Sequence, residues 1–144
     1  MTWDPTQNWQ AVLQDYYNRG FGPAADGIKE YWEMLEAART RKVDDYPGES
    51  NGYIEVYNDT FFKQAYGLLD RAAKTASQSP DRKYLQRINF VRIGLDHTKL
   101  TTELRNRSIQ WLRSDKKDKN LTDQLRAKWT EIEANCNQQP LAIY

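Results

Sequence analysis

Neighbouring acidic side chains come closer to a catalytic pattern than any other residues of this chain. Glycoside hydrolysis needs two carboxyl groups at a defined separation, one acting as an acid and the other as a base or nucleophile. Asp44 and Asp45 adjoin an aromatic-rich stretch, and Glu30 and Glu33 lie one turn apart on an expected helix. A chain with 20 acidic residues contains such neighbours by chance. A small carboxylate-based hydrolase, dependent on Asp45 or Glu33, is therefore the least favoured function.

Other catalytic chemistry is limited by a single His and a single Cys. The sequence contains no phosphate-binding G-x-x-x-x-G-K-[ST] loop, no G-x-G-x-x-G turn, no H-E-x-x-H and no C-x-x-C. His97 lies inside a long helical pattern, and no nucleophile can be assigned to it by spacing, so we expect a structural imidazole bonded to a neighbouring helix. We therefore expect no catalytic residue, no metal and no cofactor in this chain, which would not be an enzyme on its own.

Aromatic side chains favour a binding role instead. Sugars stack on Trp and Tyr rings through their C–H groups, and the chain has five Trp and nine Tyr. Tyr46, Tyr53 and Tyr57 fall in an irregular stretch and are the candidate ligand-binding residues, for a glycan or for a partner surface. Four tryptophans recur on the apolar sides of expected helices and are predicted to lie in the core: Trp9, Trp32, Trp111 and Trp129.

The elements that would position these residues are helices, because apolar residues recur every three or four positions. We expect α-helices at about 5–19, 23–42, 58–76, 80–113 and 121–137. The predicted N-caps are Asp4 for the first helix, Asn58 or Asp59 for the third and Ser79 for the fourth. Weak helix formers between Gly94 and Thr102 leave a kink or a break open as the alternative, but we predict one long helix over this segment. The predicted fold is an all-α bundle of about five helices with one long irregular loop at 44–57.

Length and charge narrow the classes of partner. With 144 residues the chain forms one domain by default. Its 21 basic and 20 acidic residues give a net charge of +1, which provides no large field for nucleic acid or an anionic membrane. No apolar run is long enough to span a bilayer, and residues 1–8 lack the features of a signal peptide. We expect neither nucleic acid nor a membrane as a partner.

A longer pattern runs from Trp3-Asp4-Pro5 through Arg19-Gly20-Phe21-Gly22-Pro23-Ala24-Ala25 to Ile28-Lys29-Glu30-Tyr31-Trp32 and Leu35-Glu36. This pattern resembles the end of the catalytic barrel and the start of the following helical region in a family of large bacterial proteins. These proteins carry a domain of unknown function of glycoside-hydrolase type, similar to alpha-glucuronidases and beta-hexosaminidases. The segment from Tyr57 through Phe61, Leu68, Leu69 and Ala72-Ala73 to the long helix also resembles that region, so the resemblance covers most of the chain.

The resemblance implies a TIM barrel followed by a helical bundle. Residues 1–20 would then form the last helix of the barrel, packed on the bundle, and residues 21–144 would form the bundle as a single unit. Catalytic residues of such barrels lie at the C-terminal ends of the strands, so none is carried onto this chain. The implied role is that of a non-catalytic C-terminal module that packs against the barrel of its own parent chain and borders its glycan site. The parent would be a secreted or periplasmic bacterial protein, and this chain a fragment of it.

A second interpretation is a self-standing helical interaction domain. Its apolar surface would bind a partner helix or a second copy of the chain, giving a homodimer. The genomic reading frame distinguishes the two interpretations, because an open frame upstream of Met1 and beyond Tyr144 favours the module of a larger protein.

Overall fold

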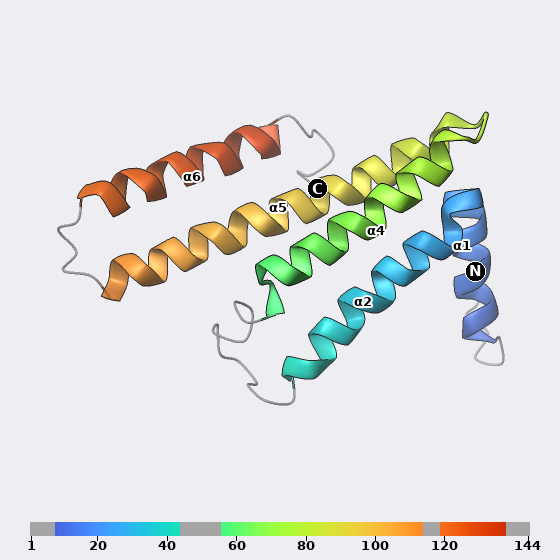
Figure 1. The fold of residues 1–144 in the computed structure, drawn as a ribbon, viewed down its shortest axis with the longest axis horizontal. Coiled ribbons are helices and arrows are strands. Elements are labelled where there is room, and N and C mark those ends of the chain that lie inside the picture. The colour runs from blue at the N-terminus through green and yellow to red at the C-terminus, as the bar shows by residue number, and fades with distance from the viewer. Residues whose placement is uncertain (1–7, 44–55, 114–118, 138–144) are drawn as a thin grey trace, which may run out of the picture. The chain divides into compact units, whose positions relative to one another are not determined.

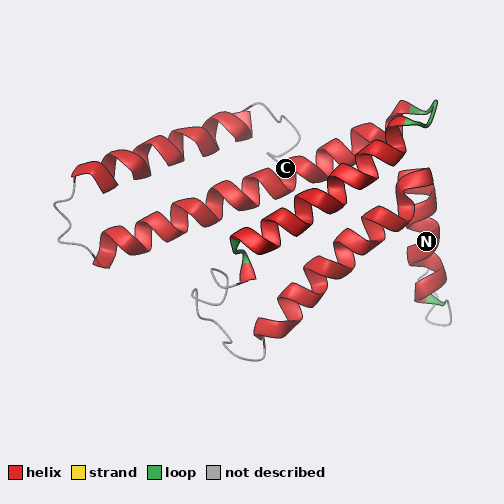
Figure 2. Ribbon diagram, viewed as in Figure 1, coloured by secondary structure: helices red, strands yellow, loops and turns green. Residues whose placement is uncertain are grey.

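The computed structural model describes residues 8–43, 56–113 and 119–137, which form five α-helices and one 3₁₀-helix (Figure 1). Figure 2 shows helices joined by turns and no strand in these residues, which confirms the predicted all-α fold. None of the helices in these ranges combines the length and apolarity needed to cross a membrane. The elements are α1 Trp9–Phe21, η1 Gly22–Ala24, α2 Ala25–Val43, α4 Asp59–Ser77, α5 Arg82–Arg113 and α6 Lys119–Asn137.

The starts of the helices follow side chains that accept hydrogen bonds from free backbone N–H groups. Asn8 has an extended backbone and accepts bonds from the amides of Gln10 and Ala11, so α1 begins at Trp9 and the predicted helix does not continue through residue 8. Asp4 and Pro5, the predicted start, lie outside the described residues. Asn58 accepts a bond of 3.0 Å from the amide of Phe61, as predicted for α4.

The start of α5 lies two residues beyond the prediction. Ser79 accepts a bond from the amide of Asp81, and Asp81 in turn accepts one from the amide of Lys83. Asp81 is therefore the N-cap, and the helix begins at Arg82 rather than at Pro80. A carboxylate at this position also interacts favourably with the positive end of the helix dipole.

The described helices belong to two compact units. The first comprises residues 1–41 and 63–92, and the second comprises residues 42–62 and 93–144. These boundaries differ from the expected division at residue 20, and the assignment of residues 1–20 to a barrel stays a prediction.

The core of the first unit depends on close contact between α2 and α4. A Cβ atom added to Gly27 would lie only 3.3 Å from the Cβ of Ala72, so small residues allow the two helices to approach. Ile28 and Leu69 are fully buried beside this contact, and Ile88 supplies a buried side chain from α5. The other buried residues of this unit are Tyr17, Phe21, Ala24, Ala25, Tyr31, Ala65, Leu68, Ala72 and Ala76.

The turn between α1 and α2 is built around Gly22. Its φ of 52° is unfavourable for a residue with a Cβ, and its amide donates to the carbonyl of Asn18 to end α1. Pro23 follows in the first turn of η1, where its missing N–H leaves no helical hydrogen bond unmade.

Helix α5 continues without a break through the segment that contains Gly94 and three threonines. Thr98, Thr101 and Thr102 each donate a bond of 2.8 Å to the carbonyl four residues earlier. These bonds satisfy the hydroxyl groups within the helix. The prediction of one long helix through this segment is therefore confirmed.

Candidate functional site

The most distinctive surface of the first unit is one side of α1. Trp9, Val12, Leu13 and Tyr16 follow the i, i+3, i+4, i+7 spacing of a single helix face, and all four side chains are exposed. The exposed fraction is 67% for Trp9 and 55% for Tyr16. We call these four residues the α1 apolar face. Large apolar side chains gathered on one exposed face indicate an interaction site.

A different side of the same helix attaches α1 to the first unit. Tyr17 and Phe21 are its buried residues, and the ring of Tyr16 contacts both at centroid distances of 5.5 and 6.1 Å. Burial raises the pKa of the Tyr17 hydroxyl, and the negative charge of Glu33 raises that pKa further. Tyr17 thus remains a neutral phenol, consistent with an anchoring role.

Charge is almost absent from α1. The helix contains one acid and one base, Asp15 and Arg19, which form an ion pair of 2.7 Å with each other. The four side chains of the α1 apolar face carry no charge. A partner would therefore be recognised by apolar contact and shape.

The C-terminal end of α1 is held by α5. Nη1 of Arg87 donates bonds to the carbonyl oxygens of Arg19, at 3.2 Å, and Gly20, at 2.8 Å. Tyr84 lies one turn earlier on α5, and its ring occupies the position where a Cβ on Gly22 would project. Both residues are more than sixty positions from α1 in the chain, so the sequence pattern gives no signal for this contact.

The three tyrosines predicted to bind a ligand are only partly described by the structure. Tyr46 and Tyr53 lie outside the described residues. Tyr57 is half-buried, and its ring contacts Phe61 at 4.9 Å and Phe62 at 6.3 Å between centroids. Tyr57 therefore packs on the first turn of α4, and its role in ligand binding stays a prediction.

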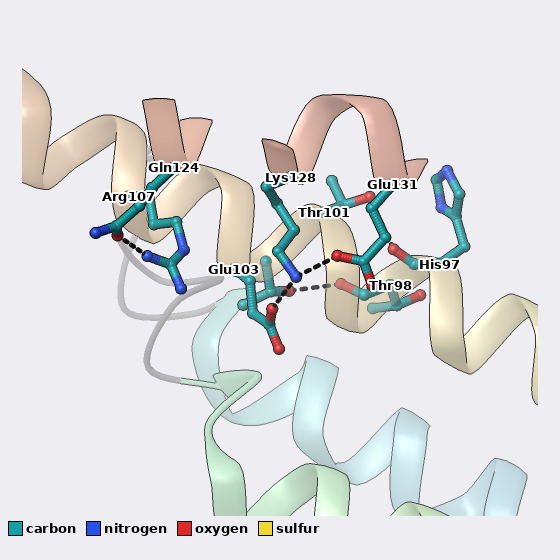
Figure 3. A network of polar contacts seen from close by, with 9 residues as sticks. His97, Thr98, Thr101, Glu103, Arg107, Gln124, Lys128 and Glu131 are labelled. Carbon is teal, nitrogen blue, oxygen red and sulfur yellow. Dashed lines mark hydrogen bonds and ion pairs between the residues drawn. The ribbon is translucent and has the colours of Figure 1, made fainter. Parts of the chain in front are cut away.

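The predicted acidic pairs are not brought together as a catalytic site. Asp44 and Asp45 lie outside the described residues, Glu30 forms an ion pair of 3.5 Å with Arg71, and Glu33 is exposed on α2. His97 is exposed on α5, and no hydrogen bond joins its imidazole to the other residues drawn in Figure 3. The predicted bond from His97 to a neighbouring helix is therefore not found among these residues.

One further sequence pattern bears on catalysis. Gly48-Glu49-Ser50-Asn51-Gly52 matches the G-x-S-x-G pattern of a serine hydrolase. That pattern acts where a strand turns sharply into a helix. These five residues lie outside the described ranges, and the described ranges contain no strand. No group of three His, Cys, Asp or Glu side chains suited to a metal occurs in the described residues either.

Three of the four tryptophans predicted in the core are exposed. Trp9 belongs to the α1 apolar face, Trp32 is 40% exposed on α2, and Trp129 is 55% exposed on α6. Trp111 is half-buried, and its Nε1 donates to Thr122 at 3.2 Å. Helical spacing identified the apolar side of each helix but not whether another element covers that side.

In the second unit, α5 and α6 are joined by polar contacts (Figure 3). The Lys128 ammonium on α6 lies 2.7 Å from Glu103 on α5 and 2.7 Å from Glu131 on its own helix. Nearer the C-terminal end of α5, Arg107 donates to Gln124. We call Glu103, Arg107, Gln124 and Lys128 the polar seam.

Electrostatics of the polar seam favour a structural role. The Lys128 side chain is only 15% exposed, and hydrogen bonds to Glu103 and then Glu131 raise its pKa above the usual value for lysine. An ammonium held in its charged form is a poor nucleophile and a poor base. The polar seam thus aligns α6 on α5.

Searches of protein-family models, curated proteins and solved structures find no match to this chain. The described residues define the class of the protein as an all-α helical bundle. The α1 apolar face and the residue patterns of the sequence are the features that bear on its function.

Proposed function

We propose that this chain is a non-catalytic helical module of a bacterial glycoside hydrolase, and that it packs against the catalytic barrel through the α1 apolar face. The observation that carries the proposal is the exposure of Trp9, Val12, Leu13 and Tyr16 on a helix that is otherwise anchored by Tyr17 and Phe21. The parent would be a secreted or periplasmic protein.

The geometry of barrel enzymes explains why α1 would have two apolar sides. Each outer helix of a TIM barrel packs on the parallel strands inside it. If α1 is the last helix of a barrel, one side must contact the strands while another contacts the helical bundle. The α1 apolar face would supply the first contact, and Tyr17 with Phe21 supplies the second.

In this proposal catalysis belongs to the barrel, and the chain contributes contacts. Tyr46, Tyr53 and Tyr57 remain the candidates for a loop that borders the glycan. We expect the isolated chain to leave chromogenic glycosides intact, whereas the parent protein hydrolyses one of them. Turnover by the isolated chain that disappears in Asp45→Asn or Glu33→Gln would instead favour the carboxylate hydrolase.

The test begins with the genomic reading frame. We expect it to encode a barrel upstream of Met1, and that barrel is produced separately from residues 1–144. The two pieces should elute together in size-exclusion chromatography. Leu13→Asp should abolish co-elution, because it places a carboxylate in the middle of the α1 apolar face.

The matched control is Ala11→Asp, which adds the same group at an exposed position of α1 outside this face. Ala11→Asp should still elute with the barrel. A reading frame without a barrel, or equal co-elution of the two aspartate variants, would contradict the proposal.

A homodimer is the second candidate function, because the α1 apolar face carries no charge that would repel a second copy. The face offers roughly 400 Å² of apolar surface, so a two-fold pair would bury about 800 Å², which is typical of weak complexes. Light scattering of residues 1–144 should then show a concentration-dependent dimer that Leu13→Asp abolishes. A monomer at all concentrations would exclude the homodimer without affecting the barrel proposal.

A further inference from the structure

Few side chains attach α1 to the rest of the first unit. Tyr17 and Phe21 are its only buried residues among those described, and both lie in the C-terminal half of the helix. Two buried rings anchor a helix but leave its direction poorly constrained. One bond of 3.4 Å from the Lys29 ammonium to the Gln14 side chain also joins the middle of α1 to α2. The direction of α1 therefore depends on few contacts, and the others described here lie at its C-terminal end.

The last turn of α1 has carbonyl groups without partners inside the helix. The Asn18 carbonyl accepts the amide of Gly22, which leaves the next two carbonyls to be satisfied. The Arg87 guanidinium donates to both of them, the oxygens of Arg19 and Gly20. A cation at this end also interacts favourably with the negative end of the helix dipole.

Tyr84 supplies the second contact of α5 with this turn. Its ring lies where a Cβ on Gly22 would be, with the nearest ring carbon 2.5 Å from that position. Tyr84 and Arg87 are three residues apart, so they share one face of α5. The Tyr84 ring therefore contacts the turn at Gly22, and the Arg87 guanidinium binds the C-terminal end of α1.

We infer that Tyr84 and Arg87 form a clamp that sets the direction of α1, with Arg87 as the positioning residue for the α1 apolar face. A rigid α1 would present that face in one orientation, which lowers the entropy lost when a partner binds. The inference rests on the proposed function only for the identity of that partner, since the clamp itself is a property of the isolated chain.

Hydrogen exchange of the 144-residue chain tests the clamp. In Arg87→Met, the amides at the C-terminal end of α1 and in η1 should exchange about three- to tenfold faster, while the amides of Leu68 and Leu69 in α4 keep the wild-type rate. In Arg87→Lys, these amides should exchange at a rate between those of wild type and Arg87→Met. An ammonium can still donate hydrogen bonds, but it lacks the fork of donors that a guanidinium presents.

The matched control is Arg92→Met. Arg92 lies on the same helix, but its guanidinium bonds to Asp70 on α4 at 2.6 Å, so its loss should leave exchange in α1 unchanged. Unchanged exchange of α1 in Arg87→Met, or equal acceleration in α1 and α4, would overturn the inference.

A distance measurement gives a second readout. Spin labels at the exposed positions Gln10 and Lys74, in a Cys136→Ser background, report the separation of α1 from α4. The distance distribution should broaden in Arg87→Met and stay narrow in Arg92→Met. Equally narrow distributions in both variants would also overturn the inference. Neither measurement involves the barrel, so failure of the clamp is distinguishable from failure of co-elution.

Discussion

Gly22 is subject to two separate constraints. Its φ of 52° lies in the region that side chains with a Cβ rarely adopt, and the ring of Tyr84 occupies the space into which a Cβ would project. Gly20, two residues earlier, is free of both constraints, because a Cβ there would meet no atom within 4 Å. The two glycines thus differ strongly in what a substitution should cost.

We predict that Gly22→Ala lowers the free energy of unfolding by about 1–3 kcal/mol, because it adds backbone strain and displaces the Tyr84 ring. Gly20→Ala should leave stability unchanged or raise it by up to about 1 kcal/mol, since alanine is the better helix former. Urea denaturation followed by circular dichroism measures both values. A loss of similar size in the two variants would contradict this account of the turn.

The raised pKa of Lys128 predicts how the contribution of this residue to stability depends on pH. Because its pKa is raised in the folded state, its stabilising contribution is complete below the pKa of the unfolded chain and is lost as pH rises through the folded value. The difference in unfolding free energy between wild type and Lys128→Met should therefore be constant near neutral pH and shrink above about pH 10.4. Urea denaturation at a series of pH values measures this difference. If the unfolding free energies of wild type and Lys128→Met kept the same difference above about pH 10.4, the prediction would be contradicted.

At the scale of the elements, the contact between α2 and α4 depends on small side chains. Ala72 is buried, and its Cβ would lie 3.3 Å from a Cβ on Gly27. We predict that Ala72→Leu lowers the free energy of unfolding by about 1–3 kcal/mol, because the added carbons force the helices apart. The neighbouring Ala73 is half-buried, and Ala73→Leu should change stability by less than about 0.5 kcal/mol. Thermal melts compare the stability of Ala72→Leu with that of Ala73→Leu. Equal losses of stability in the two variants would argue against the close contact between α2 and α4.

Much of the element structure could be predicted from the sequence, because apolar periodicity is a local signal. The helices lie close to their predicted positions, and the Asn58 cap was among the predicted alternatives. The predicted first helix does not pass through Asn8, because the Asn8 side chain caps the helix that begins at Trp9. The predicted long helix α5 is confirmed, and the threonine hydroxyls inside it bond to carbonyls of the same helix.

The candidate site was harder to predict, because it depends on contacts between distant segments. Trp9 and Tyr17 are both aromatic residues of α1, yet only Tyr17 is buried. Helical spacing groups residues onto a side but does not show which sides other helices cover. The two bonds from Arg87 to α1 likewise carry no sequence signal, since each joins a side chain to a backbone carbonyl.

Across the molecule, the helices differ in how many of their side chains are buried. Helix α4 contributes many of the buried side chains, whereas Ile132 is the one buried side chain among the described residues of α6. Stability within a protein follows such differences in buried apolar contact. The polar seam adds directional bonds to α6 but little buried apolar area.

We therefore predict that amides in the middle of α6 exchange at least about tenfold faster than those of Leu68 and Leu69 in α4. Hydrogen exchange read by NMR measures both sets in one experiment. Glu103→Gln, which weakens the polar seam, should accelerate α6 further and leave α4 unchanged. Equal protection of α4 and α6 would mean that burial in the described residues does not govern local stability.

The lack of charge on the α1 apolar face has a thermodynamic consequence. Association through this face would remove apolar surface from water and carry a negative change in heat capacity. Its affinity would depend little on sodium chloride concentration, since screening acts on charges. Sulfate would strengthen it, and cooling would weaken its hydrophobic contribution. Calorimetric titration across temperature and salt would therefore distinguish association through an apolar face such as this one from association through charged groups.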